Sequence, residues 1–221
     1  MSTAVGVMAR APSSAGKTRL SPHLSPSRLT ALRAAMLADT LNALAGVPDV
    51  TVFFTPDEAE PEIAAVAGPA FRCVPQGGGD LGARMLAALR HLLQDDAWDA
   101  ALLVGSDIPL LTADHLREAE QTLRASGGVV LGPADDGGYY LIGMTEACVE
   151  LFEGIEWGTE SVLTDTLRAA ERAGVEARLA RSGYDVDTED DLLRLERDLK
   201  WAPSAVCPAL RSWFRQREDL S

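Results

Sequence analysis

The feature that most constrains the fold is an alternation of short apolar, β-branched runs with longer segments of helical periodicity. Runs typical of strands lie at Thr3–Ala9, Val50–Thr55, Phe71–Gln76, Asp99–Asp107, 128–133, 139–144 and 176–180. Segments with helical spacing or caps lie at Pro26–Ala45, Glu58–Val66, 79–95, Thr112–Ala125, 159–174 and Glu189–Leu199. This order predicts an α/β fold, a three-layer sandwich with a mainly parallel mixed sheet.

The chain length of 221 residues favours one domain, or one domain with a small appendage. We expect a single nucleotide-binding domain over residues 1–200, since the alternation runs through that range without a linker. Two prolines follow Lys200, and the segment 201–221 is therefore expected to be a peripheral tail. No run reaches the ~18 apolar residues that a membrane span requires.

The charge balance excludes some classes of partner. Formal net charge is −13, from 33 acidic and 20 basic residues. This argues against nucleic acid and against an anionic membrane surface, because both need a basic face. Three cysteines without paired spacing and an N-terminus without signal-peptide order predict a cytoplasmic protein.

The stretch "APSSAGKTRL" (residues 11–20) fits a loose phosphate-loop pattern. A true phosphate loop starts a helix at its lysine, but Pro22 and Pro26 prevent an uninterrupted helix from Lys17. We therefore expect an open cationic loop that binds a polyphosphate, with an ordinary solvated loop as the alternative. The candidate nucleotide-binding residues of this loop are Arg10, Gly16, Lys17 and Arg19.

Carboxylates follow two extended segments. Asp107 ends the most apolar strand, in "LLVGSDIPLL", and Asp185 and Asp187 stand two apart in "YDVDTEDDL". Period two points the latter pair to one side, where a cation would relieve their repulsion. Oxygen ligands suit Mg²⁺ or Mn²⁺, so these three aspartates are metal candidates. A turn cap at Asp107 and favourable charge at a helix start are the alternatives.

Two glycine-containing stretches could contact substrates. In "GPADDGGYYLIG" the candidates are Asp136, Gly137, Gly138 and Tyr139, with a plain hairpin turn as the alternative. In "PQGGGDLGARM" they are Gln76, Gly79, Asp80 and Arg84, with a flexible loop as the alternative. The three histidines are scattered and predict no triad with a serine or cysteine.

The motifs "KTRL", "GGDLGARM", "GSDIPLL", "GPADDGGYYLIG", "IEWGTESVL" and "DVDTEDDL" occur in this order. Together they resemble a bacterial family of GT-A-like transferases named for arsenosugar-biosynthesis glycosyltransferases. More distantly the chain is similar to phospholactate guanylyltransferases and molybdenum-cofactor nucleotidyltransferases. The resemblance spans about Val5 to Leu195.

The resemblance implies a nucleotide-diphospho-sugar transferase fold with a nucleotide near Lys17, Arg19 and Asp80. It also implies a metal at Asp107 and Asp187. The acceptor pocket that it implies is formed by Gly137, Gly138, Tyr139, Trp157 and Thr159. One departure is that Arg10 replaces a family lysine and Gly16 directly precedes Lys17, so the loop is shorter here.

These observations favour a metal-dependent transferase in which Lys17, Asp107 and Asp187 are the catalytic candidates. The first hypothesis is transfer of a sugar from a nucleotide-sugar to a small acceptor. The alternative is nucleotidyl transfer from a nucleoside triphosphate to a small phosphate or phosphonate, with release of pyrophosphate. A nucleotide-binding regulatory module without turnover is a third hypothesis. We expect a nucleotide or nucleotide-sugar and a small molecule as partners, and leave a homodimer open.

Overall fold

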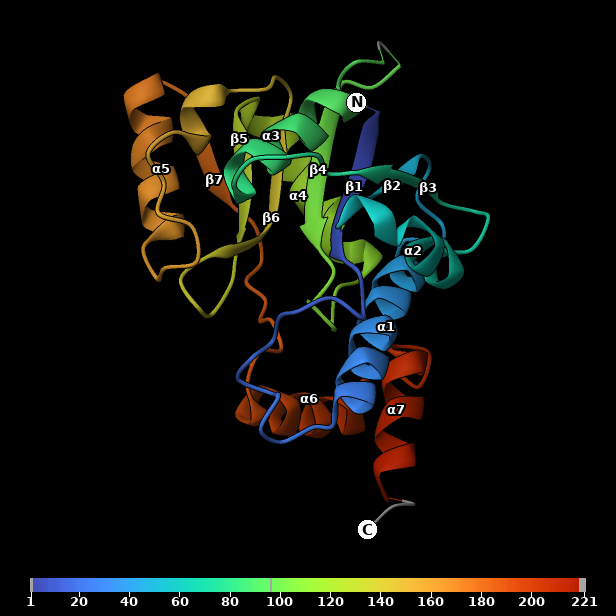
Figure 1. Cartoon of the computed structure of the whole chain (residues 1–221). Helices are drawn as coiled ribbons and strands as arrows, with labels where there is room; N and C mark the ends of the chain where they lie inside the picture. The colour runs from blue at the N-terminus through green and yellow to red at the C-terminus, as the bar shows by residue number, and fades with distance from the viewer. Residues whose placement is uncertain (1, 96, 219–221) are drawn as a thin grey trace.

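A mixed sheet forms the centre of the molecule (Figure 1). The computed structural model describes residues 2–95 and 97–218. Within them the sheet has seven strands in the order β3-β2-β1-β4-β6-β5-β7. Their bounds are β1 Thr3–Arg10, β2 Val50–Thr55, β3 Arg72–Pro75, β4 Ala100–Gly105, β5 Val129–Pro133, β6 Tyr139–Met144 and β7 Ala177–Leu179. Strand β6 is antiparallel to β4 and β5, and the other pairs are parallel. The predicted α/β class is confirmed.

Helices connect the strands and begin at recognisable caps. Their bounds are α1 Pro26–Ala43, α2 Glu60–Ala67, α3 Leu81–Leu92, α4 Ala113–Ser126, α5 Val162–Ala173, α6 Glu189–Trp201 and α7 Pro208–Glu218, with short 3₁₀ turns η1 Asp57–Ala59 and η2 Val149–Phe152. Ser25 caps α1 by accepting a hydrogen bond from Arg28 N, and Asp80 caps α3 by accepting from Ala83 N. Helix α1 ends at Ala43, two residues before the expected end at Ala45.

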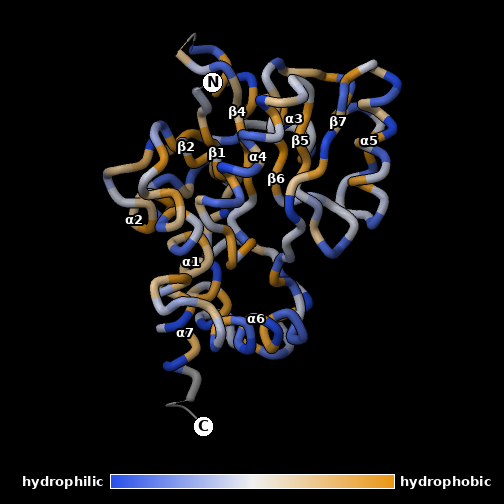
Figure 2. Tube along the Cα trace, turned by 180° about the vertical axis from the view of Figure 1, so that it is seen from behind, coloured by the Kyte–Doolittle hydropathy of each residue, from blue (hydrophilic) through white to orange (hydrophobic). Residues whose placement is uncertain are grey.

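The side chains of each strand alternate between two apolar layers. In β1, Val5 and Val7 pack in the layer covered by α1, α2 and α4, whereas Ala4 packs in the layer covered by α3 and α5. In Figure 2 the hydrophobic colour accordingly concentrates in the strands, and α6 alternates between hydrophobic and hydrophilic residues. No helix in the described part of the chain combines the length and apolar character that crossing a membrane requires.

A third apolar cluster lies beyond the carboxyl ends of the central strands, between α1, α6 and α7. The segment 201–221, expected to be a peripheral tail, instead contains α7, which packs beside α1 through the buried side chains of Leu210, Trp213 and Phe214. Asp39 of α1 is buried and accepts hydrogen bonds from Ala209 N (2.9 Å) and Leu210 N (2.8 Å) at the start of α7. Residues 219–221 lie outside the described residues.

Candidate active site

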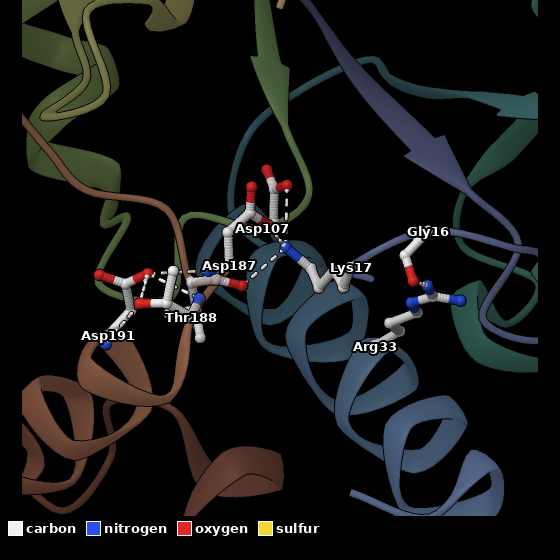
Figure 3. Close-up of polar contacts among 8 residues, drawn as sticks. Gly16, Lys17, Arg33, Asp107, Asp187, Thr188 and Asp191 are labelled. Atoms are coloured by element: carbon white, nitrogen blue, oxygen red, sulfur yellow. Dashed lines mark hydrogen bonds and ion pairs between the residues drawn. The ribbon is translucent and has the colours of Figure 1, made fainter. Parts of the chain in front are cut away.

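Three segments that are distant in sequence meet at one ammonium group (Figure 3). Lys17 lies in the loop after β1, Asp107 follows β4, and Asp187 precedes α6. The Nζ atom of Lys17 lies 2.6 Å from Oδ1 of Asp187 and 3.3 Å from Oδ2 of Asp107, and it donates to Val186 O at 2.7 Å. The carboxyl ends of β1 and β4 are neighbours in the sheet, which explains why these groups converge.

The electrostatics of this cluster depend on the lysine. Burial alone would lower the pKa of Lys17, but Asp107 and Asp187 outweigh burial and raise it. Burial likewise opposes ionisation of Asp187, yet the Lys17 ammonium lowers the pKa of that carboxyl. In this structure the positive charge of Lys17 is therefore paired with carboxylates and is not free to bind a phosphate.

Asp185 differs from Asp187 although both lie in the same extended segment. Burial, followed by the nearby charges of Asp187, Asp107 and Asp136, raises the pKa of Asp185 to about 7. The alternative to metal binding, a favourable negative charge at the start of a helix, describes Asp191. Its Oδ2 atom accepts hydrogen bonds from the backbone nitrogens of Asp187 (3.1 Å) and Thr188 (2.8 Å). The cap thus fixes the segment's backbone and leaves the Asp187 carboxylate facing Lys17.

Arg33 of α1 organises the cationic loop, and sequence reasoning missed it. Its guanidinium donates hydrogen bonds to the carbonyl oxygens of Pro12, Ser14 and Gly16. Arg10 also donates to a loop carbonyl, that of Ala15, at 2.9 Å. The sequence gives no sign of this role. Arg33 looks like an ordinary charged residue of an amphipathic helix, and its partners are backbone carbonyls, which any residue could supply.

A cavity of about 300 Å³ opens between this loop and the carboxylates. We call it the cationic pocket. It is lined by Arg10, Gly16, Lys17, Arg33, Met36, Ser106, Asp107 and Asp187. Arg19 does not line it but is exposed and close enough to act electrostatically on Asp187. The pocket combines fixed positive charge with carboxylates, an arrangement suited to a polyphosphate accompanied by a cation.

A second cavity, of about 350 Å³, lies on the other side of Asp107 and Asp187. We call it the acceptor cavity. Of the predicted acceptor residues it includes Asp136, Gly138, Tyr139, Trp157 and Thr159. The apolar part of its wall comes from Met8, Leu81, Met85, Leu103, Val104, Ile108, Ile142 and Val162.

Gly137, also predicted to contact the acceptor, does not line this cavity. The backbone conformation of the turn explains why a glycine stands there. Its φ is +86°, and a Cβ there would collide with the carbonyl oxygen of Glu160. The hairpin between β5 and β6 that was the alternative for this motif does form. The same turn also presents Asp136, whose Oδ1 accepts from Gly138 N at 2.9 Å, to the acceptor cavity.

The residues predicted from "PQGGGDLGARM" form a group next to the site. Buried Gln76 donates to Ala9 O and Phe53 O and accepts a hydrogen bond from Arg84 at 3.3 Å. Asp80 caps α3, and Gly79 has a φ of +94°. None of the four lines either cavity among the described residues, although Leu81 and Met85 of the same helix line the acceptor cavity.

The donor set has the chemistry that a hard divalent ion requires. Asp107, Asp185 and Asp187 present carboxylate oxygens, and Lys17 supplies one positive charge against three negative ones. Among the described residues no three such side chains are grouped closely enough to hold a metal ion, and the Lys17 ammonium pairs with both Asp107 and Asp187. The three carboxylates therefore fit a divalent ion by charge and by donor chemistry. Binding the ion requires the Lys17 ammonium to move away from Asp107 and Asp187.

Comparison with known sequences gives two kinds of relative. Residues 37–159 match the family model described as "Uncharacterized protein conserved in bacteria (DUF2064)". The chain is 31% identical over 191 residues to 2-phospho-L-lactate guanylyltransferase of Methanothrix thermoacetophila, covering 83% of this chain and 79% of the relative. It is 36% identical over 186 residues to phosphoenolpyruvate guanylyltransferase of Roseiflexus castenholzii, covering 81% of each chain.

Comparison with solved structures agrees on the architecture. A protein of Desulfovibrio desulfuricans G20 that is assigned as a nucleotide-diphospho-sugar transferase superimposes with a TM-score of 0.86, at 31% identity and 98% coverage of both chains. A cytidylyltransferase of Leptospira borgpetersenii superimposes with a TM-score of 0.60 at 17% identity, covering 99% of this chain and 96% of that one, which indicates a shared fold alone. The predicted fold family is thus confirmed, and the chain is a transferase by its relatives.

Proposed function

Because this chain belongs to the bacterial family DUF2064 and is a relative of guanylyltransferases, we propose that it is a nucleotidyltransferase. It couples a nucleoside triphosphate to a small phosphate or phosphonate and releases pyrophosphate. The relatives favour this second of the two transfer hypotheses over sugar transfer, which the sequence motifs had placed first.

The observation that carries the proposal is that Asp107 and Asp187 line both cavities. A triphosphate in the cationic pocket and an acceptor in the acceptor cavity would therefore meet at these two carboxylates. An oxygen of the acceptor phosphate or phosphonate forms a bond to the α-phosphorus. The bond from that phosphorus to the oxygen bridging toward the β-phosphorus breaks, and pyrophosphate leaves with the electron pair.

The chain's own groups then have separate tasks. Arg10 and the loop that Arg33 holds in shape neutralise the departing pyrophosphate, because fixed positive charge costs no reorganisation during the reaction. Asp107 and Asp187, with Asp185 beside them, would hold Mg²⁺ or Mn²⁺. When bound, such an ion would offset phosphate charge as the α-phosphorus is attacked. Lys17 would then be released from Asp187 toward the phosphates.

Sugar transfer is retained as a second candidate for one reason. The structure that superimposes with a TM-score of 0.86 is assigned as a nucleotide-diphospho-sugar transferase. The resemblance to the arsenosugar family belongs to this candidate. A cytoplasmic location and a homodimer stay predictions from the sequence.

Phosphorus NMR of the products distinguishes the candidates. The protein is incubated with Mg²⁺, GTP or CTP, a UDP- or GDP-sugar and a mixture of small phosphates and phosphonates. Nucleotidyl transfer produces pyrophosphate, whereas sugar transfer produces a nucleoside diphosphate. We expect pyrophosphate, and we expect Asp107→Asn to remove its formation while Asp114→Asn, an exposed carboxylate paired with Arg117, retains it. A nucleoside diphosphate as the sole product would overturn the proposal, and binding of nucleotide without turnover would favour the regulatory module.

A further inference from the structure

We propose that the acceptor cavity takes a phosphate or phosphonate whose organic part is a short apolar chain bearing an ammonium group. The inference rests on the proposed function, whose acceptor it describes. Three features of the cavity support it. They are the carboxylates of the wall, the ion pairs that some of these carboxylates make and others lack, and the aromatic rings that line the same cavity.

The charge of the wall has one sign. Four carboxylates line the acceptor cavity, and no lysine, arginine or histidine does so among the described residues. The four are Asp107, Asp136, Asp185 and Asp187. The ion proposed above would offset the charges of Asp107, Asp185 and Asp187 and would contact the acceptor's phosphate. Asp136 is the carboxylate of the wall outside that ligand set, and a negatively charged organic group beside it would be repelled.

Two of these carboxylates share one cationic partner in the free protein, and the other two have no ion pair among the described residues. Lys17 pairs with Asp107 and Asp187 from the side of the cationic pocket. Within the described residues, Asp136 and Asp185 have no ion pair within 4.0 Å. The neighbouring Asp135 is the contrast, because it pairs with Arg194 at 2.6 Å and does not line the cavity. Asp136, on the rim of the cavity, is therefore a carboxylate available to a cationic ligand.

Aromatic side chains stand beside these carboxylates. Tyr139, Tyr140 and Trp157 line the same cavity. The Trp157 ring is fixed by stacking on Phe152 at 6.4 Å and by an edge contact with Tyr139 at 6.4 Å. Its Nε1 atom is buried without a hydrogen-bond partner among the described residues. Aromatic rings and an unpaired carboxylate that line one cavity would attract an ammonium group through cation–π and Coulomb interactions.

The inference separates this chain from the substrates that its relatives' names state. Phospholactate and phosphoenolpyruvate each carry a carboxylate next to the phosphate. A site for such a molecule needs a cation facing that carboxylate. Apart from the proposed ion, which the phosphate would contact, the described wall of this cavity has no cationic side chain. An ammonium group at the same place would be attracted, because it would offset the charge of Asp136.

Three acceptors that carry the same number of carbon atoms on the phosphate provide the test. They are phosphoethanolamine with an ammonium group, ethyl phosphate with none, and phosphoglycolate with a carboxylate. The kcat/KM for pyrophosphate release is measured for each with the active nucleotide. We expect phosphoethanolamine to exceed ethyl phosphate about tenfold, and phosphoglycolate to be the poorest. A phosphoglycolate value above that of phosphoethanolamine would overturn the inference.

Two variants assign the preference to one carboxylate. Asp136→Asn keeps the oxygen that accepts from Gly138 N while removing the charge. In this variant the ratio of phosphoethanolamine to ethyl phosphate should fall toward one, whereas Asp135→Asn should leave the ratio unchanged. An unchanged ratio in Asp136→Asn would contradict the role given to that residue.

Failure of the proposed function gives a different result. If none of the acceptors supports pyrophosphate release, the nucleotidyl-transfer proposal fails and the cavity is tested by calorimetry. Tighter binding of phosphoethanolamine than of phosphoglycolate to the wild type, lost in Asp136→Asn, would still support the inference. The reverse order of affinities would overturn it.

Discussion

The Nζ atom of Lys17 lies 2.6 Å from Oδ1 of Asp187, although the two residues are 170 positions apart in the chain. This ion pair joins the loop after β1 to the segment that leads into α6. The lysine side chain is only 10% exposed, whereas the aspartate is 43% exposed. The Lys17 side chain is therefore largely shielded from solvent, whereas the Asp187 carboxylate remains accessible to it.

Replacing Lys17 by methionine should destabilise the metal-free protein. The change leaves Asp107 and Asp187 without their shared cation, and we expect the free energy of unfolding to fall by about 1–3 kcal/mol. Denaturant unfolding of Lys17→Met, Asp187→Asn and the double variant measures the coupling. Additive effects of the two changes would show that the pair does not stabilise the fold.

Replacing Arg33 by lysine should weaken nucleotide binding through the phosphates. An ammonium cannot hold three carbonyl oxygens in the way that the guanidinium does, so the loop loses its shape. We expect about tenfold weaker binding of the triphosphate by calorimetry and little change for the nucleoside. Arg28→Lys is the matched control, since Arg28 lies on the same helix but contacts Trp213 of α7. An equal loss for nucleoside and triphosphate would exclude a role in shaping the phosphate site.

Replacing Asp39 by alanine should loosen α7. The change leaves two backbone N–H groups at the start of that helix without their acceptor, and we expect the free energy of unfolding to fall by about 1–3 kcal/mol. Asp114→Ala, at an exposed position of α4, should stay within about 0.5 kcal/mol of the wild type. If Asp39→Ala unfolds like the wild type, α7 does not contribute to the cooperative core.

Asp185 makes stability depend on pH in one direction. Its pKa is raised to about 7 in the fold, against about 4 in the unfolded chain, so the folded state holds a proton that the unfolded state has lost between these values. The contribution of Asp185 to the stability of the metal-free protein should therefore fall as pH rises from about 4 to 7. Asp185→Asn should reduce this decline and be more stable than the wild type at pH 8.

The control for the pH experiment is Asp190→Asn, an exposed neighbour in the first turn of α6. It should retain the wild-type decline when the midpoint of thermal unfolding is recorded across the pH range. A decline that persists in Asp185→Asn would assign the pH dependence to other groups.

The fold could be predicted from the sequence because most helices and strands are specified by local patterns. Alternating strand and helix periods, and caps such as Thr188 with Asp191, specify each element without reference to distant residues. The rule that sites form at the carboxyl ends of parallel strands brought Asp107 and Asp187 into one expected cluster, and the structure brings both to one ammonium.

Other parts of the site depend on contacts that no local pattern records. Lys17 was expected to face phosphate, yet in the free protein its partners come from the loop after β4 and from the C-terminal third of the chain. Arg33 binds only backbone carbonyls, which carry no residue identity. Helix α7 begins at the second of the two prolines that follow Lys200. It is stabilised by packing on α1 and by Asp39, and the local sequence alone therefore predicted a tail.

The most direct test of the account is the position of manganese in a crystal grown with Mn²⁺ and a non-hydrolysable nucleoside triphosphate analogue. We predict an anomalous peak between Asp107 and Asp187, the triphosphate in the cationic pocket, and the Lys17 ammonium displaced from Asp187 toward the phosphates. A nucleotide bound elsewhere, or bound with Lys17 still paired to both carboxylates and no manganese between them, would contradict the account.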